Sequence, residues 1–170
     1  TGEWQDDIAD LLRRKIAEPS EERALGKEIP CVTGIEDSVS QAVQEQYEEN
    51  PYPRWIKAGL AHKRVSLGAV LSGSPLYFDL AGDNLPERPE ILMAGCGTGK
   101  HTLYMTSRFE GAEALEVDLS LNSLSYAKRK TAELGLSNIE YVQGISWKWA
   151  NSGANSTSSD VPACCTILAT

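Results

Sequence analysis

A short apolar run that stops at three closely spaced glycines constrains this sequence more than any other feature. The run covers residues 91–94, and Gly95, Gly97 and Gly99 follow it directly before a helix-like segment. A buried strand that leads into a glycine turn and a helix lets a ligand lie against bare backbone. The free N–H groups of the first helical turn then face a negative group on that ligand. The pattern predicts a ligand site at the start of the helix.

An acidic residue follows at the distance expected for a ribose-binding group. Asp118 stands nineteen residues after Gly99, at the end of a second apolar stretch over residues 112–117. In nucleotide-binding α/β folds, an acid about 20 residues beyond the glycine loop binds the ribose. A carboxylate only accepts hydrogen bonds, so two neighbouring hydroxyls can both donate to it. We therefore expect a nucleoside site at the carboxyl ends of parallel strands.

Strands and helices alternate through this part of the chain. We expect strands at residues 90–94, 112–117 and 139–143, and helices at residues 100–108 and 121–134. The alternation predicts an α/β fold, a Rossmann-like parallel sheet with right-handed crossovers and helices on both faces. The sheet is truncated at about three strands, and a helical extension precedes it. The second helix has an inward stripe made of Leu121, Leu124, Ala127, Thr131 and Leu134.

The stretch over residues 91–144 resembles the first half of a class I S-adenosylmethionine-dependent methyltransferase. AGCGTG resembles the glycine loop of that family, EVDLSLNSLSYAKRK its second strand and following helix, and NIEYVQG its third strand. The resemblance implies S-adenosyl-L-methionine as the cofactor, with the loop behind its methionine part and Asp118 on its ribose. Cys96 is interpreted as a small core residue and not a nucleophile, because no nearby base is evident. The implied cofactor contacts are Gly95, Cys96, Gly97, Thr98, Gly99, Asp118 and Leu119.

Residues 40–55, SQAVQEQYEENPYPRW, resemble a segment that precedes the methyltransferase domain in bacterial proteins, many of which also carry tetratricopeptide repeats. The resemblance suggests such repeats upstream in the parent protein. Asp37 or Ser40 is expected to cap a short helix, which the following prolines end. Two interpretations stay open: a lid over the site with Arg54 on an anion, or packing on the sheet for structural reasons. The aromatic residues of the lid would be Tyr47, Tyr52 and Trp55.

Composition limits the remaining classes of function. The 170 residues are 41% apolar and carry a formal charge of −8, and the basic clusters at residues 13–15 and 128–130 are expected on solvated helix faces. Nucleic-acid binding is therefore disfavoured. No membrane span or signal peptide is evident, which favours a cytoplasmic protein. The four cysteines lack the spacing of a metal site, and His62 and His101 are expected at the surface or in packing roles.

Four parts are expected along the chain. Residues 1–35 form a helical extension or linker, with a helix over residues 4–17 that Pro19 and Ser20 end. Residues 36–88 form a capping helix and loop region, residues 89–144 the cofactor-binding α/β half-domain, and residues 145–170 an irregular tail. The chain begins with Thr1 and not with Met, which suggests a fragment of a longer protein.

The character of the chain changes after Gly144. The tail has only two charged residues, and Ile145 stands where the family has an acid after its third strand. We hypothesise a one-base deletion near codon 145. When residues 145–170 are translated back into codons and these are read one base earlier, allowed codon choices give a sequence that resembles the continuation of the family. At three places every possible codon choice gives the same amino acid in the shifted frame. These are Glu across Trp147–Lys148, Gly across Trp149–Ala150 and Leu across Cys164–Cys165. The alternative is a natural low-complexity tail.

These features predict a S-adenosylmethionine-dependent methyltransferase of which this chain carries the cofactor-binding half. The groups that orient the acceptor are expected from the fourth strand onward, so the chain itself is expected to be inactive and to bind the cofactor weakly or not at all. The acceptor and the catalytic residues are unassigned. One alternative is a NAD(P)-dependent oxidoreductase, which Lys100 disfavours because the dinucleotide fingerprint has a small residue at that position. Another is a non-enzymatic adaptor that binds a partner through residues 4–17 and the segment around Trp55.

Overall fold

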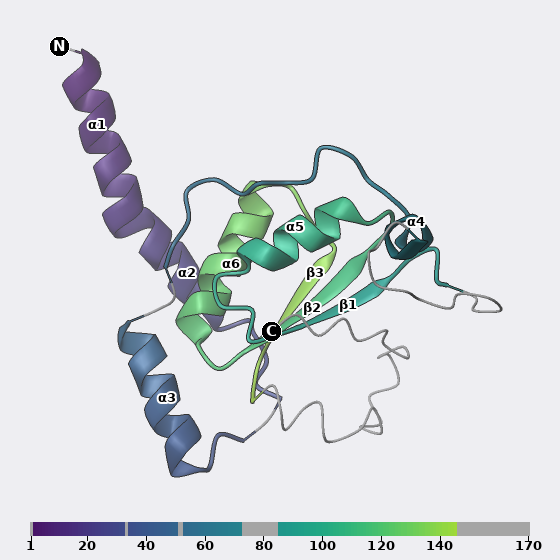
Figure 1. Cartoon of the computed structure of the whole chain (residues 1–170). Helices are drawn as coiled ribbons and strands as arrows, with labels where there is room; N and C mark the ends of the chain where they lie inside the picture. Colours follow the sequence, from purple (N-terminus) through teal and green to yellow (C-terminus); the bar gives the residue numbers. More distant parts are fainter. Residues whose placement is uncertain (1, 33, 51–52, 73–84, 146–170) are drawn as a thin grey trace.

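The computed structural model describes residues 2–32, 34–50, 53–72 and 85–145 (Figure 1). Tyr52 and the tail over residues 146–170 lie outside the described residues. The elements are α1 (Gly2–Leu12), the π-helical turn η1 (Arg13–Ala17), α2 (Glu18–Gly26), α3 (Ser38–Glu49), α4 (Leu67–Ser72), β1 (Glu90–Ala94), α5 (Lys100–Arg108), β2 (Glu113–Asp118), α6 (Leu121–Glu133) and β3 (Ile139–Gln143).

The three strands form a parallel sheet in the order β1-β2-β3, which confirms the sheet predicted from the sequence. Its register pairs Ile91 with Ala114 and Ala114 with Ile139. Both crossovers run in the same direction across the sheet, so right-handed connections place α5 and α6 over the same face (Figure 1). The expected helices on the opposite face stay a prediction. Between the sheet and the two helices lie Ile91, Met93, Leu103, Ala114, Leu124, Ala127, Ile139 and Tyr141.

Most element boundaries agree with the sequence patterns to within one residue. β1, β3 and α5 begin and end as predicted, and β2 lies one residue later than expected. The prediction for Leu134 is wrong, because α6 ends at Glu133 and Leu134 is 38% exposed. Gly135 follows with a φ of 69°, a left-handed conformation that commonly ends a helix.

The N-terminal helix does not end at Pro19, contrary to the prediction. Pro19 is the second residue of α2, and η1 lies directly before it. In η1 the backbone N–H of Glu18 donates to the carbonyl of Arg13, five residues back. A regular α-helix would bring the proline ring against the carbonyl four residues earlier, and the wider π-helical turn accommodates it.

The basic cluster at residues 128–130 is not on a solvated helix face, contrary to the prediction. α2 packs along α6 (Figure 1), and only 5% of Arg129 and 8% of Lys130 are exposed. Arg129 forms ion pairs with Glu18 and Glu22 of α2. Two of its three carboxylate partners are more than a hundred residues away in the sequence, and the third, Glu133, is a half-exposed neighbour on α6. The local sequence therefore does not indicate that Arg129 is buried. The cluster at residues 13–15 is exposed as expected.

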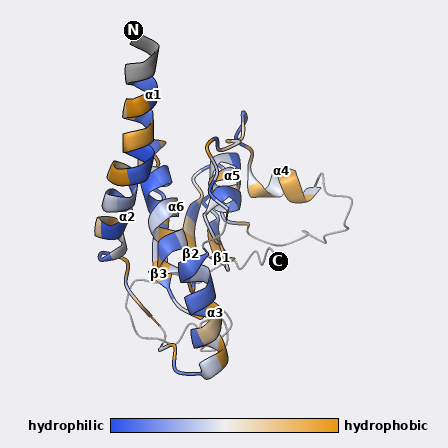
Figure 2. Cartoon of the chain, turned by 90° about the vertical axis from the view of Figure 1, so that its left-hand side faces the viewer, coloured by the Kyte–Doolittle hydropathy of each residue, from blue (hydrophilic) through white to orange (hydrophobic). Residues whose placement is uncertain are grey.

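The first part of the chain presents apolar side chains to solvent. α1 projects away from the sheet and carries apolar residues along its length (Figure 2). On α1 and η1, four apolar residues are each more than half exposed, namely Ile8, Leu11, Leu12 and Ile16. α3 begins at the predicted cap, where Oδ1 of Asp37 accepts the backbone N–H of Ser40 over 2.8 Å. Among the described helices, none combines the length and the apolar character that crossing a bilayer requires.

Candidate functional site

The glycine loop between β1 and α5 has a backbone that glycine alone adopts easily. Gly95, Gly97 and Gly99 have φ values of 71°, 56° and 72°. A side chain at any of these positions would be strained. At Gly99 the space is closed as well, since a Cβ would lie 2.8 Å from the Cβ of Ala127 and 2.9 Å from Oε1 of Glu116. The third glycine is therefore required both by its backbone and by the packing of α5 over β2 and α6.

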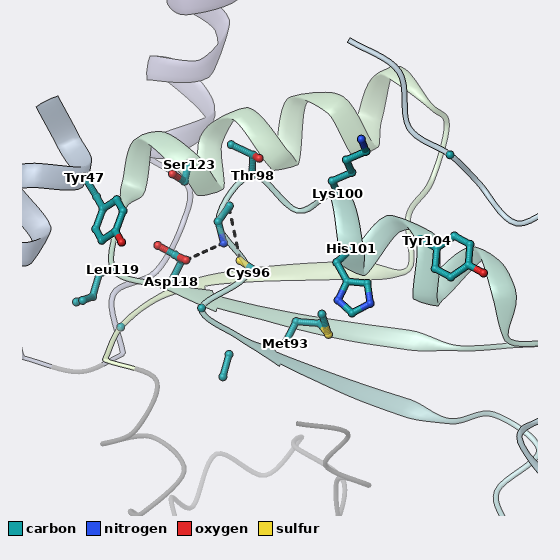
Figure 3. Close-up of a pocket in the computed structure, with 15 residues that line it drawn as sticks. Tyr47, Met93, Cys96, Thr98, Lys100, His101, Tyr104, Asp118, Leu119 and Ser123 are labelled. Atoms are coloured by element: carbon teal, nitrogen blue, oxygen red, sulfur yellow. Dashed lines mark hydrogen bonds between the residues drawn. The ribbon is translucent and has the colours of Figure 1, made fainter. Parts of the chain in front are cut away.

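Asp118 lies against this loop, as the sequence predicted. Its Oδ2 accepts the backbone N–H of Gly97 over 2.8 Å (Figure 3). Its Oδ1 accepts the backbone N–H of Ser120 over 2.9 Å. Burial raises the pKa of the carboxyl, and hydrogen bonds from the N–H groups of Ser120, Gly97 and Leu119 oppose the rise. A carboxylate has about four lone-pair sites, so Asp118 keeps room for a further donor. Asp118 can therefore hold the loop and accept hydroxyl donors from a ligand at the same time.

A cavity of about 770 Å³ opens beside the loop and Asp118. Pockets of about 300–1,000 Å³ are typical of small-molecule sites. Its wall contains six of the seven contact residues expected from the sequence, while Gly99 is buried and does not line it. The six are Gly95, Cys96, Gly97, Thr98, Asp118 and Leu119.

The first turns of α5 also line the cavity, which the sequence interpretation missed. Lys100, His101 and Tyr104 reach its wall from this helix (Figure 3). The spacing of Lys100 and Tyr104 was an available signal, because residues four apart on a helix share a face. His101 is exposed, as predicted, and it forms part of the cavity wall.

The aromatic residues expected to form a lid have different roles. Tyr47 lines the cavity from α3 and is 41% exposed. Trp55 is only 8% exposed, and its Nε1 donates to the carbonyl of Thr98 over 2.8 Å. Trp55 is therefore not part of a lid, and the alternative interpretation, packing for structural reasons, is confirmed for this residue. The anion that Arg54 binds belongs to the chain itself, since Nη2 lies 2.6 Å from Oε2 of Glu22.

Glu116 is a buried charge that the sequence did not point out. It is fully buried on β2, and its two carboxylate oxygens have no hydrogen-bond partner among the described residues. Burial raises its pKa to about 7, and the neighbouring Thr102 hydroxyl and Cys96 thiol partly oppose this rise. Burial likewise raises the pKa of the Cys96 thiol well above its usual value. A thiol with a raised pKa is a poor nucleophile, in agreement with a packing role for Cys96.

Comparison with known proteins decides among the families that use such a loop. Residues 91–166 match the model of a family described as a methyltransferase domain. This match to a methyltransferase domain agrees with the resemblance to class I S-adenosylmethionine-dependent methyltransferases seen in the sequence. The match includes most of the segment expected to be an irregular tail. Because residues 146–170 lie outside the described part, the frameshift hypothesis stays a prediction.

Two relatives and one solved structure illustrate the similarity of this methyltransferase domain. An uncharacterized protein from Synechococcus sp. is 27% identical over 126 residues, which cover 65% of this chain and 26% of that protein. A tRNA (guanine-N(7)-)-methyltransferase from Rubrobacter xylanophilus is 35% identical over 79 residues, which cover 42% of this chain and 35% of the relative. A solved S-adenosylmethionine-dependent methyltransferase from Aquifex aeolicus is 27% identical with a TM-score of 0.30, over 32% of this chain and 30% of the other. The chain thus spans between about a quarter and a third of the length of the curated relatives.

Proposed function

We propose that this chain carries the S-adenosyl-L-methionine site of an enzyme that transfers the cofactor's methyl group, and that the chain by itself binds the cofactor weakly. The main support is the position of the Asp118 carboxylate, 2.8 Å from the Gly97 N–H and in the wall of the same cavity. Loop glycines without a Cβ and a carboxylate with spare lone pairs fit a nucleoside that carries a sulfonium side chain. When bound, the cofactor supplies a methyl group activated by the positive sulfur.

Each group of the site has a distinct part in this proposal. The backbone of residues 95–97 lies behind the methionine part of the ligand, and Asp118 accepts the two ribose hydroxyls. Leu119, which directly follows Asp118 in the cavity wall, provides apolar contact for the base. The α5 residues Lys100, His101 and Tyr104 line the part of the cavity that the loop and Asp118 do not. Methyl transfer depends mainly on in-line positioning and exclusion of water, so these walls contribute chiefly by orienting the ligand.

The acceptor and the catalytic residues are left unassigned. The relative from Rubrobacter xylanophilus is named for a tRNA substrate, but this chain covers only 35% of its length. That relative therefore does not define an acceptor for this chain. A cytoplasmic location is part of the proposal, in keeping with the reducing conditions under which a thiol such as that of Cys96 persists. Cell fractionation of the parent organism tests the location.

An NMR titration tests the proposal directly. S-adenosylhomocysteine is added to ¹⁵N-labelled chain, because chemical-shift changes report weak as well as tight binding. We expect saturable shifts at the amides of Gly95, Gly97 and Asp118. The matched ligand is NAD⁺ at the same concentrations, which tests the oxidoreductase alternative. The proposal is refuted by unchanged loop amides with S-adenosylhomocysteine, or by equal or larger shifts with NAD⁺.

A further inference from the structure

Two hydrogen bonds tie the glycine loop to the segment that follows α3. The indole Nε1 of Trp55 donates to the carbonyl of Thr98 over 2.8 Å, and the Thr98 hydroxyl donates to the carbonyl of Pro53 over 3.1 Å. Thr98 is 3% exposed, so these polar groups have no access to bulk water as replacement partners. The Thr98 carbonyl belongs to the peptide that joins Thr98 to Gly99. Holding this carbonyl fixes the peptide plane at the last turn of the loop.

Trp55 is in turn held by α6. Its backbone carbonyl accepts a hydrogen bond from the Tyr126 hydroxyl. The two rings meet edge to face, with 5.7 Å between their centres and 90° between their planes. The Nζ of Lys130 lies 5.3 Å from the centre of the Trp55 ring, within the range of a cation–π contact. These contacts hold the indole between α6 and the glycine loop.

A buried carboxylate connects this segment to the N-terminal extension. Glu22 of α2 is 5% exposed and lies between two guanidinium groups, those of Arg54 at 2.6 Å and Arg129 at 2.9 Å. Both guanidinium groups also lie over the Tyr126 ring, 5.1 Å and 5.4 Å from its centre. The Arg54 side chain is 43% exposed, and its 2.6 Å bond to the buried Glu22 holds its guanidinium group against α2.

We infer that α2 positions the glycine loop through Glu22, Arg54 and Trp55, and thereby sets the affinity of the cofactor site. Glu22 holds Arg54, the next residue places its indole N–H on the Thr98 carbonyl, and the loop takes the conformation that faces the cavity. The effect on affinity rests on the proposed function, whereas the effect on the loop does not. Trp55 is a positioning residue in this scheme, since it does not line the cavity.

The first test compares two glutamates that both pair with α6. Glu22→Gln removes the buried charge, and Glu28→Gln removes a carboxylate that is 63% exposed and pairs with Lys128. Amide hydrogen exchange in the ligand-free chain is the readout, with the β2 and β3 amides as reference for global stability. We expect Glu22→Gln to speed exchange at the Gly97 and Gly99 amides beyond any change in the sheet. Glu28→Gln is expected to have no such effect, because exposed ion pairs contribute little.

The second test removes the indole N–H donor. Trp55→Phe keeps an aromatic ring and loses the hydrogen bond to Thr98, while the matched control Tyr141→Phe loses a buried hydroxyl that contacts Thr131. We expect Trp55→Phe to weaken S-adenosylhomocysteine binding about fivefold, the effect of one net hydrogen bond. Tyr141→Phe is expected to leave the affinity within about twofold of wild type.

The outcomes separate this inference from the proposed function. Loop amides that exchange at wild-type rates, relative to the sheet, in both Glu22→Gln and Trp55→Phe overturn the inference. If the wild-type chain binds S-adenosylhomocysteine and Trp55→Phe binds it equally well, the inferred effect of Trp55 on affinity is overturned. A wild-type chain that does not bind S-adenosylhomocysteine contradicts the proposed function, and the ligand-free exchange rates still decide whether α2 positions the loop.

Discussion

The backbone N–H of Gly97 donates to Oδ2 of Asp118 over 2.8 Å, which joins two residues 21 positions apart in the sequence. The parallel pairing of β1 with β2 brings the ends of these strands together and makes the bond geometrically available. The loop and the acid are therefore held together without a ligand. A preorganised site of this kind loses less conformational freedom on binding.

Replacing Asp118 tests its predicted role on the ribose. Asp118→Asn keeps the size of the side chain but exchanges one acceptor oxygen for a donor, which opposes the backbone N–H groups and any ligand hydroxyl. We expect at least about tenfold weaker binding of S-adenosylhomocysteine by NMR titration. Asp10→Asn, in α1 and outside the cavity, is the matched control. Equal affinity of wild type and Asp118→Asn would remove Asp118 from the site.

A pair of glycine substitutions separates backbone strain from steric closure. Gly99 and Gly135 have nearly equal φ values of 72° and 69°, but a Cβ would meet neighbouring atoms only at Gly99. Gly135→Ala should cost about 1 kcal/mol of unfolding free energy from left-handed strain. Gly99→Ala should cost about 3 kcal/mol, since overpacking adds to the strain. Urea unfolding measures both, and equal losses would show that the space at Gly99 is not limiting.

The buried Glu116 predicts a specific dependence of stability on pH. Burial raises its pKa from the ordinary value of 4.5 to about 7, so between these values the folded state binds more protons than the unfolded state. The stabilisation is full below pH 4.5 and is lost as the pH rises through about 7. A difference of this size corresponds to about 3 kcal/mol.

The matched variants for this prediction lie on the same strand. Glu116→Gln cannot ionise, so its urea unfolding free energy should fall less between pH 5 and pH 8 than that of wild type. Glu113→Gln, at an exposed position of β2, should follow wild type. Parallel pH profiles of wild type and Glu116→Gln would contradict the shifted ionisation.

Two neighbouring basic residues on α6 should differ sharply in their contribution to stability. Arg129 is buried with Glu18 and Glu22, while Lys128 pairs with the exposed Glu28. Arg129→Met removes one of the two basic partners of the buried Glu22 and one partner of Glu18, and should cost about 3 kcal/mol. Lys128→Met should change the unfolding free energy by less than about 1 kcal/mol. Thermal or urea unfolding of the two variants checks this, and equal effects would contradict the assigned burial of Arg129.

The hypothesis for residues 145–170 is tested on the encoding DNA. We expect that a single-base insertion near codon 145 restores a long open reading frame rich in apolar strand patterns. The reason is that three forced letters of the alternative reading agree with the continuation of the family. A gene without such a frame would favour the natural low-complexity tail.

Local patterns were sufficient for the α/β unit. The strand, the glycine loop, the helix and Asp118 follow one another within 29 residues, and their conformations depend on neighbouring residues and on the face that must be buried. For this reason β1, α5 and β3 were predicted with their observed ends. The position of Asp118 beside the glycine loop followed from the same reasoning, because parallel strands end at one edge of the sheet.

The N-terminal extension shows where such reasoning stops. The sequence by itself determined the glycine loop, the acid at its side and the order of the strands, since each depends on a periodicity or a backbone requirement of a short segment. Only the tertiary structure decided that α2 covers α6, that Arg129 and Glu22 are buried together and that Trp55 supports the loop. These contacts join segments more than 40 residues apart, as in the bond from Trp55 to Thr98, and burial of a charge becomes favourable only when its distant partner is in place.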